Sequence, residues 1–407
     1  MKSKVLLTVF CLCLSCLSMD GKGKCKNHSN SACRVAAQMY PGWNLANTME
    51  ATGQGLAAET SWQTTKTTKE LIDFVKQQGF RSVRIPCSWD IHSDAQGTID
   101  PQWLARVKMI VDDCIKDGLY VVLNDHWDNG WIEVKGFSKT DQTYEKVDEQ
   151  TIQSKIARLK DLWTQIAVSF KGYDEHLLFA GLNEPFQQYN LFHDKHQELT
   201  PILLRYNQAF VETVRATGGK NKKRILVVQT PGISISAAVK EENHFTMPVD
   251  PIGKGHLMVE VHYYEPWDFC GQEEGGKWFW GQGQHVEGDP HNCEWGEETW
   301  SENQFASMKK NFLDEGYPVI LGEYGVNWRE VGTRQDLHDA SVKAWFKDVT
   351  QKAISNGCVP MLWDINVADR HGEKGTLTVI DRSRIKVFCT VAMEGITEGV
   401  RSANWPD

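Results

Sequence analysis

Short apolar segments alternate with longer amphipathic segments along this chain, and this alternation restricts the fold more than any other feature. Eight runs rich in Val, Ile and Leu have the length of buried strands. The segments between several of them place apolar residues three and four positions apart, as a helix with one buried face requires. Parallel strands joined by helices are therefore expected. The runs are 39–45, 82–86, 119–123, 177–182, 224–228, 255–263, 318–321 and 359–363.

The helical spacing is clearest in 67–78, 101–116 and 152–170, and Trp163 lies on the apolar face of the last. Eight strand–helix units close most naturally into a barrel. An open doubly wound sheet is the alternative, but its glycine-rich phosphate turn after the first strand is missing. We therefore predict an α/β fold, a (β/α)8 TIM barrel, as a single domain over residues 35–407.

The first 20 residues have the pattern of a secretory signal peptide. Two lysines precede an apolar run over 5–17, which is too short to span a bilayer. Cys16 leaves open a lipid anchor. We expect residues 21–34 to form a linker, no membrane-spanning segment, and a protein that is secreted or held at the cell surface.

Cysteine usage fits export without identifying a pairing. Eleven cysteines occur, three of them within the predicted signal peptide, and none of the others forms a Cys-x-x-Cys motif. Cys270 and Cys293 lie in one loop-like stretch and are the best candidates for a disulfide. Free buried thiols are the alternative.

Charge and motif content exclude several classes of function. The formal net charge is −9, and no stripe of Lys and Arg appears, so a polyanion such as nucleic acid would be repelled. The 13 histidines form no His-Glu-x-x-His or His-x-His motif, which disfavours a metal-dependent hydrolase. No Gly-x-Ser-x-Gly motif occurs. We expect a neutral substrate, no cofactor and no metal.

Polar and charged residues follow the apolar runs where the strands are expected to end. In this fold, catalytic groups come from the carboxyl ends of several strands. One such residue could be an ordinary solvated loop residue, but six strands ending in this way favour an active site. The residues are Arg84, Asn124, Asp125, His126, Asn183, Glu184, His262, Tyr264, Glu323, Trp363 and Asp364.

Glu184 and Glu323 stand out because each ends a buried strand, in Leu-Asn-Glu-Pro and Leu-Gly-Glu-Tyr-Gly. Two carboxylates facing each other across a cleft are what glycosidic cleavage requires. One is protonated to assist the leaving oxygen, and the other is ionised to attack the anomeric carbon or activate water. A pair of capping or salt-bridged surface glutamates is the alternative, and the position of both residues argues against it.

Seven short motifs follow one another along the chain: Gly-Trp-Asn-Leu-Ala-Asn-Thr at 42–48, Arg-Ile-Pro at 84–86, Leu-Asn-Asp-His at 123–126, Asn-Glu-Pro at 183–185, His-Tyr-Tyr at 262–264, Gly-Glu-Tyr-Gly at 322–325 and Trp-Asp at 363–364. In this order and spacing they resemble glycoside hydrolase family 5, the cellulase family, from about residue 42 to residue 364. The motif at 42–48 looks most like the branch that contains endo-β-1,4-glucanases, xyloglucanases and lichenases.

The resemblance implies roles for the matching residues. Glu184 would be the general acid/base and Glu323 the nucleophile of a retaining mechanism, with carboxyl groups roughly 5–5.5 Å apart. Arg84 and Tyr264 would contact Glu323, and Asn183 would bind the sugar 2-hydroxyl. Trp127 stands where many relatives have a second histidine, which leaves the substrate range open. The other substrate-binding residues would be Asn44, His126, His262 and Trp363, the last as a stacking floor.

Sixteen tryptophans are many for a chain of this length. Sugar faces stack on aromatic rings, although core packing accounts for about half of such residues. Two long connections, 127–150 and 265–300, are expected to serve function, the second as a wall of the cleft. We expect the cleft to include Trp43, Trp89, Trp127, Trp131, Trp267 and Trp363, and Trp163 to lie in the core.

We therefore expect a monomeric endo-acting hydrolase of β-1,4-glucosidic bonds in plant cell-wall polysaccharide. Cellulose-type glucan, xyloglucan and mixed-linkage glucan are the candidate substrates. A β-mannanase or xylanase with the same mechanism is an alternative. A catalytically inactive glycan-binding barrel is another, but Arg84, Asn183 and Tyr264 are all retained beside the two glutamates, which argues against it.

Overall fold

The computed structural model describes residues 30–406 except 135–136, 139–142, 145–147 and 187–190. The predicted signal peptide and the proposed lipid anchor at Cys16 lie outside the described residues. The linker predicted to reach residue 34 ends earlier, because helix α1 (Ser31–Ala36) begins at Ser31. Asn30 caps this helix by accepting the N–H of Cys33.

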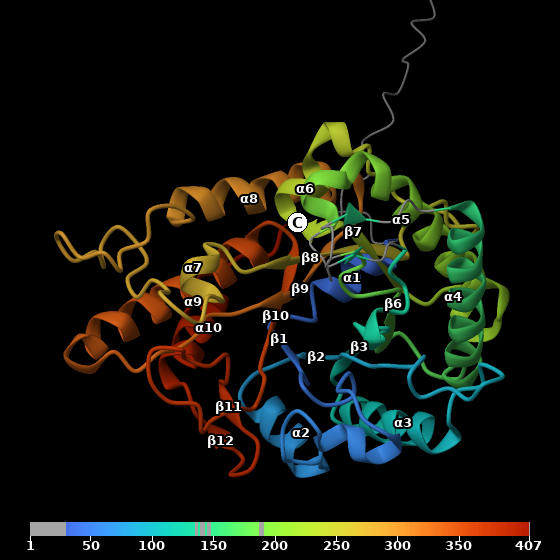
Figure 1. Ribbon diagram of the computed structural model, residues 1–407, viewed down its shortest axis with the longest axis horizontal. Helices are drawn as coiled ribbons and strands as arrows, with labels where there is room; N and C mark the ends of the chain where they lie inside the picture. The colour runs from blue at the N-terminus through green and yellow to red at the C-terminus, as the bar shows by residue number, and fades with distance from the viewer. Residues whose placement is uncertain (1–29, 135–136, 139–142, 145–147, 187–190, 407) are drawn as a thin grey trace, which may run out of the picture.

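Eight parallel strands close into a barrel, which confirms the predicted fold (Figure 1). Their order around the barrel is β1-β10-β9-β8-β7-β6-β3-β2. Each overlaps one of the predicted apolar runs. The strands are β1 (Gly42–Asn44), β2 (Ser82–Ile85), β3 (Tyr120–Asn124), β6 (Leu177–Ala180), β7 (Leu226–Ser234), β8 (Leu257–Tyr263), β9 (Val319–Tyr324) and β10 (Cys358–Leu362).

Helices surround the barrel, and at least one follows each strand. They are α2 (Lys69–Gln77), α3 (Pro101–Lys116), α4 (Glu149–Ser169), α5 (Leu191–Ala216), α6 (Ile235–Val239), α8 (Glu298–Asn311), α9 (Gln335–Ser355) and α10 (Thr390–Ser402), with α7 (Trp267–Cys270) between β8 and α8. Short antiparallel pairs are β4 (Phe137–Ser138) with β5 (Thr143–Tyr144), and β11 (Ile380–Asp381) with β12 (Lys386–Val387). Short 3-10 helices cover Gly55–Thr60, Asp128–Gly130, Gly219–Lys222, Glu241–Asn243, Leu313–Glu315 and Gly332–Arg334.

Capping side chains explain where the predicted helices begin. The helix predicted over 101–116 is observed with these bounds, because Asp100 caps it and Pro101 occupies its first position. Helix α4 starts three residues before the predicted 152, since the Asp148 side chain accepts the N–H of Thr151. A cap outside the apolar pattern therefore sets this boundary.

Helix α1 closes the amino-terminal end of the barrel. Its residues Ala32, Val35 and Ala36 are fully buried and belong to the same apolar cluster as the inward-facing strand residues Val122 and Ile320. A second and larger cluster lies between the strands and the surrounding helices. Helix α1 thus fills the end of the barrel where the strands begin, and the open end is the one where the strands finish.

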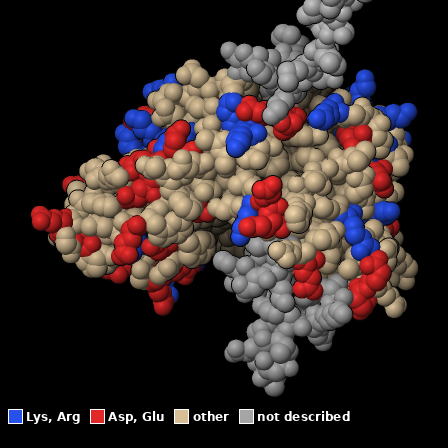
Figure 2. All heavy atoms as spheres, turned by 90° about the horizontal axis from the view of Figure 1, so that it is seen from above, with Lys and Arg blue, Asp and Glu red and all other residues tan. Residues whose placement is uncertain are grey.

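Charged side chains of both signs are mixed on the face of the molecule seen in Figure 2, without a broad basic area. Among the described residues, no helix has both the length and the apolar character needed to cross a membrane.

The disulfide suggested for Cys270 and Cys293 is not formed. Both are free and buried, as are Cys87, Cys114, Cys358 and Cys389. Burial raises the pKa of the Cys270 and Cys293 thiols, which keeps them protonated. Cys33 is disulfide-bonded.

Truncation of Trp163 should strongly destabilise the fold. As predicted, this α4 residue is fully buried; its Nε1 donates to the Gly181 carbonyl at 2.9 Å and its ring centroid lies 4.6 Å from that of Phe210. Trp163→Ala should lower the free energy of unfolding by about 3–5 kcal/mol, measured by urea denaturation. Met109→Ala, at an exposed α3 position, is the control and should change it by less than about 0.5 kcal/mol. A loss below about 1 kcal/mol for Trp163→Ala would contradict this packing role.

Candidate active site

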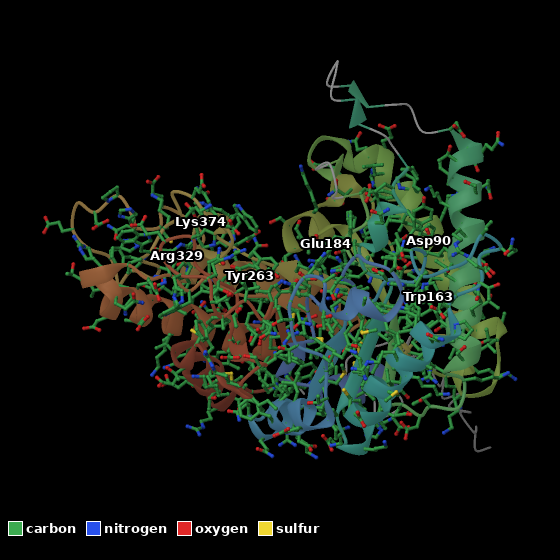
Figure 3. The ribbon with its side chains drawn as sticks, turned by 60° about the horizontal axis from the view of Figure 1, so that its bottom comes forward. Asp90, Trp163, Glu184, Tyr263, Arg329 and Lys374 are labelled. Carbon is green, nitrogen blue, oxygen red and sulfur yellow. The ribbon has the colours of Figure 1, made fainter. Side chains whose placement is uncertain are left out.

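A cleft of about 430 Å³ opens where the barrel strands end. Figure 3 shows Glu184 at this rim, between the segments that carry Arg329 and Lys374 on one side and Asp90 on the other. Side chains from five different strand ends meet here. The lining residues are His126, Trp127, Ile132, Glu133, Leu182, Asn183, Glu184, Pro185, Tyr264, Trp267, Glu323, Trp363 and Leu377.

Glu184, after β6, and Glu323, in β9, lie on either side of His262 from β8. One oxygen of each carboxylate and a nitrogen of the imidazole all lie within 4.8 Å of one another. His262 Nδ1 is 2.6 Å from Glu184 Oε1 and 3.7 Å from Glu323 Oε2. The Glu184 side chain is 36% exposed and that of Glu323 is 7% exposed. Glu184 is therefore reachable from solvent, whereas Glu323 lies deeper in the cleft.

Two donors hold the Glu323 carboxylate. Arg84 Nη1 donates to its Oε1 at 3.1 Å, and the Tyr264 hydroxyl donates to its Oε2 at 3.0 Å. Burial raises the pKa of Glu323, against the opposing effects of His262 and Arg84. Ionisation of this carboxylate therefore depends on these neighbours, because they offset its loss of contact with water.

Arg84 connects several strands beneath the cleft. It is fully buried on β2, and it donates to Asn44 Oδ1 at 3.0 Å and to Asn183 Oδ1 at 2.6 Å. The strand register places Asn44 of β1 directly beside Arg84. Asn44, Asn183 and Glu323 thus come from different parts of the barrel but all contact this one guanidinium.

The prediction that Asn44 contacts substrate is wrong. Asn44 is fully buried and does not line the cleft. Its amide donates to the carbonyl groups of Gly322 at 2.8 Å and Met361 at 3.1 Å. Its position at the end of the short strand β1 leaves it below the floor, where it supports Arg84.

The two site histidines differ in charge. Burial alone would lower the pKa of His262, but the carboxylates of Glu323, Glu184 and Glu260 outweigh burial and raise it to about 9. His262 is therefore a cation at neutral pH and donates to Glu184. Although burial opposes it, this contact lowers the pKa of Glu184.

His126 is neutral, because burial and the nearby charge of Arg84 lower its pKa well below the usual range. Its ring is stacked with that of Trp363, with centroids 5.6 Å apart and planes 8° from parallel. The stacked pair gives one side of the cleft a flat aromatic surface.

Distance alone would allow Glu184, His262 and Glu323 to hold a metal ion. A ligating histidine must be neutral, however, and the pKa of His262 is raised to about 9. The Arg84 guanidinium, 3.1 Å from Glu323, would also repel a cation. Together with Arg84, the three residues form a charge-paired cluster whose two cations are protein side chains, His262 and Arg84.

Three of the six tryptophans predicted for the cleft line it, namely Trp127, Trp267 and Trp363. Trp267 is 56% exposed and meets the Tyr264 ring edge-on. It comes from the long connection 265–300, so the predicted wall is present at this point. Farther along the same connection, Trp280 is buried.

Trp43, Trp89 and Trp131, which were also predicted for the cleft, do not line it. Trp43 and Trp89 are fully buried, and Trp131 is packed against the core with its Nε1 donating to Asp125. Trp43 precedes Asn44 in β1, and successive strand residues face opposite sides. The indole of Trp43 therefore points into the layer between strands and helices, where its Nε1 donates to Asp364 Oδ2 at 2.9 Å.

Sequence reasoning missed two carboxylates. Glu133 lines the cleft and accepts the N–H of Phe186 at 2.8 Å, and burial raises its pKa to about 7. It lies in a long loop without regular spacing, so no pattern indicated it. Glu260 is fully buried on β8, two positions before His262. Its period-two spacing from a site histidine was a usable signal.

Comparisons with known proteins bear on this cleft. Endoglucanase A of Paenibacillus barcinonensis is 34% identical over 354 residues, which cover 84% of this chain and 85% of that protein. The xyloglucan-specific endo-beta-1,4-glucanase of Bacteroides ovatus is 33% identical over 354 residues, covering 84% and 66%.

Solved structures are similar over nearly the whole chain. XEG5B, a xyloglucan-specific beta-1,4-glucanase from a ruminal metagenomic library in complex with XXLG, has 55% identity and a TM-score of 0.86, covering 92% of this chain and 97% of that one. A family 5 xyloglucanase from Paenibacillus pabuli has 33% identity and a TM-score of 0.78, covering 90% and 99%. The family model for cellulase (glycosyl hydrolase family 5) matches residues 46–369. The chain therefore belongs to glycoside hydrolase family 5.

Proposed function

We propose that this protein is a retaining endo-β-1,4-glucanase, with Glu323 as nucleophile and Glu184 as general acid/base. The approach of the two carboxylates carries this proposal, since one oxygen of each lies within 4.8 Å of the other. Retaining pairs stand about 5–5.5 Å apart, whereas inverting pairs need about 6.5–9.5 Å to admit a water.

In the first step, the Glu323 carboxylate attacks the anomeric carbon while Glu184 gives a proton to the leaving oxygen. The glycosidic bond breaks and a glycosyl–Glu323 ester forms. In the second step, Glu184 takes a proton from a water, the water attacks the same carbon, and the ester bond breaks. The more exposed position of Glu184 suits a group that meets both leaving group and water.

The charge of the cluster supports this division of roles. Arg84 and Tyr264 both donate to Glu323, which favours its ionised form. Protonated His262 places its Nδ1 2.6 Å from Glu184 Oε1, so the pair shares the proton that the acid must deliver. Asn183 accepts from Arg84 through Oδ1, which leaves its amide group for a sugar hydroxyl.

We also propose xyloglucan as the preferred polymer and action outside the cell. The relatives whose names specify xyloglucan, including the 55% identical structure, support the substrate.

The basic and apolar pattern of residues 1–20 supports export. Mannan and xylan would need different contacts from the loops around the same cluster. An inactive barrel is disfavoured, because Glu323 is held by the donors Arg84 and Tyr264 and Glu184 lies beside His262.

A polysaccharide panel tests this function. Release of reducing ends should be largest on xyloglucan, measurable on barley β-glucan and carboxymethylcellulose, and near background on mannan and xylan. Internal cleavage should lower polymer length early, as seen by size-exclusion chromatography. NMR of the first product should show the β-anomer. Equal or greater activity on mannan or xylan would reject the glucanase, and an initial α-anomer would reject the retaining mechanism.

A further inference from the structure

A third carboxylate, that of Glu260, lies directly beneath the catalytic pair. Its side chain has no solvent exposure and does not line the cleft. Oε1 is 2.9 Å from Arg84 Nε and 3.5 Å from His262 Nε2, and Oε2 accepts from Gln229 Nε2 at 2.8 Å. Glu260 therefore contacts both cations of the site without access to a substrate.

The surroundings fix Glu260 in this place. Gln229, on the neighbouring strand β7, is itself anchored because its Oε1 accepts the N–H of Leu182 at 2.9 Å. On the other side, a Cβ added to Gly322 of β9 would lie 2.1 Å from Glu260 Oε1. The missing side chain at position 322 thus makes room for this carboxylate, one residue before the nucleophile.

A count of charges shows what Glu260 adds. The cations facing this cluster are Arg84 from β2 and His262 from β8. The carboxylates are Glu260, Glu323 from β9 and Glu184 from the end of β6. Tyr264 and His126 are neutral, because the pKa of Tyr264 is raised and that of His126 is lowered, mainly by burial. Three carboxylates against two cations leave room for one further proton.

That further proton is the one the proposed mechanism needs. Cleavage begins with Glu323 ionised and a proton available to Glu184. If Glu260 carried no charge, ionised Glu184 and Glu323 would already balance Arg84 and His262. The cluster would then hold its last proton less strongly, because opposite charges attract a proton and like charges repel it.

We propose that Glu260 is a positioning residue whose buried negative charge keeps the Glu184–His262 pair loaded with the proton that Glu184 delivers. This rests on the proposed function, in which Glu184 is the acid. His262 is the link, since its Nδ1 is 2.6 Å from Glu184 and its Nε2 is 3.5 Å from Glu260. The three residues form a carboxylate–imidazole–carboxylate row that titrates as one unit.

The test compares Glu260→Gln with Glu260→Asp across the pH range. Glutamine keeps the size of the side chain and removes the charge, so the pKa values of His262 and Glu184 should both fall. The basic limb of the kcat/KM profile should move to lower pH by about 1 unit or more. Aspartate keeps the charge, so its basic limb should stay near that of the wild type even where kcat falls.

Asp250→Asn is the matched control, because Asp250 is a buried carboxylate paired with Arg215 at 2.7 Å outside the cleft. It should leave the pH profile in place. An active Glu260→Gln variant with an unmoved basic limb would overturn the proposal, as would an equal shift in Glu260→Asp. If the wild type cleaves no glucan at any pH, the proposed function fails instead.

A second measurement requires no folded variant. In wild-type enzyme with ¹⁵N-labelled histidine, NMR titration should show His262 protonated up to about pH 9. A midpoint below about 7, close to the value of a free imidazole, would show that the surrounding carboxylates do not hold the proton and would overturn the proposal.

Discussion

Glu323→Ala should reduce kcat on a soluble glucan by about 10⁴- to 10⁶-fold, the largest effect expected of any single substitution in this chain. The change removes the group that forms the covalent intermediate and leaves Arg84 without the carboxylate it contacts at 3.1 Å. Initial rates of reducing-end release would measure the loss. Binding of an oligosaccharide should persist, because the aromatic walls of the cleft are unchanged.

A small anion distinguishes lost chemistry from lost folding. Azide should enter the space left by Glu323, close to Arg84 and Tyr264. With an activated aryl β-glycoside as substrate, the azide should attack the anomeric carbon from the side that Glu323 occupied. It should restore part of the rate and give the α-glycosyl azide. Glu330→Ala, a partly exposed carboxylate farther along the chain from β9, should keep wild-type activity. Residual Glu323→Ala activity within tenfold of wild type would reject the nucleophile assignment.

Glu184→Ala should show the second largest effect, and its size should depend on the leaving group. On polysaccharide, loss of the acid should lower the rate by about 10²- to 10⁴-fold. On an aryl glycoside whose leaving group needs no proton, formation of the ester should be nearly unaffected. Breakdown of the ester should then limit turnover, because water loses its base.

Pre-steady-state kinetics with a dinitrophenyl glycoside would measure both steps for Glu184→Ala. A burst of dinitrophenol followed by slow turnover is expected, and azide should speed the slow phase. An equal loss in the burst rate for good and poor leaving groups would contradict the acid/base role.

The barrel and the catalytic pair could be predicted because both leave local signals. All eight barrel strands are buried on both faces, so they read as continuous apolar runs. Glu184 and Glu323 stand at the ends of two such runs, where a charged residue is conspicuous. In the region around β1, the same patterns were less informative, since this strand has only three residues.

The errors and omissions concern what lies beneath the cleft. Asn44 and Trp43 belong to the first motif and Trp89 follows the second, but burial below the cleft depends on the direction that each side chain takes. Glu260 lies two positions before His262, but its contacts were not predictable because its partners Arg84 and Gln229 are far away in sequence. Such contacts are set by the register between strands, which a single sequence does not state.

The buried cysteines also have a practical consequence. Cys87, Cys114, Cys270, Cys293, Cys358 and Cys389 are enclosed, and burial raises the pKa of their thiols, so they should react slowly with maleimides. Within the part of the chain that the structure describes, an introduced surface cysteine would therefore be labelled selectively. Replacement of the exposed Trp295 by cysteine would place a fluorophore on the loop that continues from Trp267. Its emission could follow polymer binding in real time without removal of any native thiol.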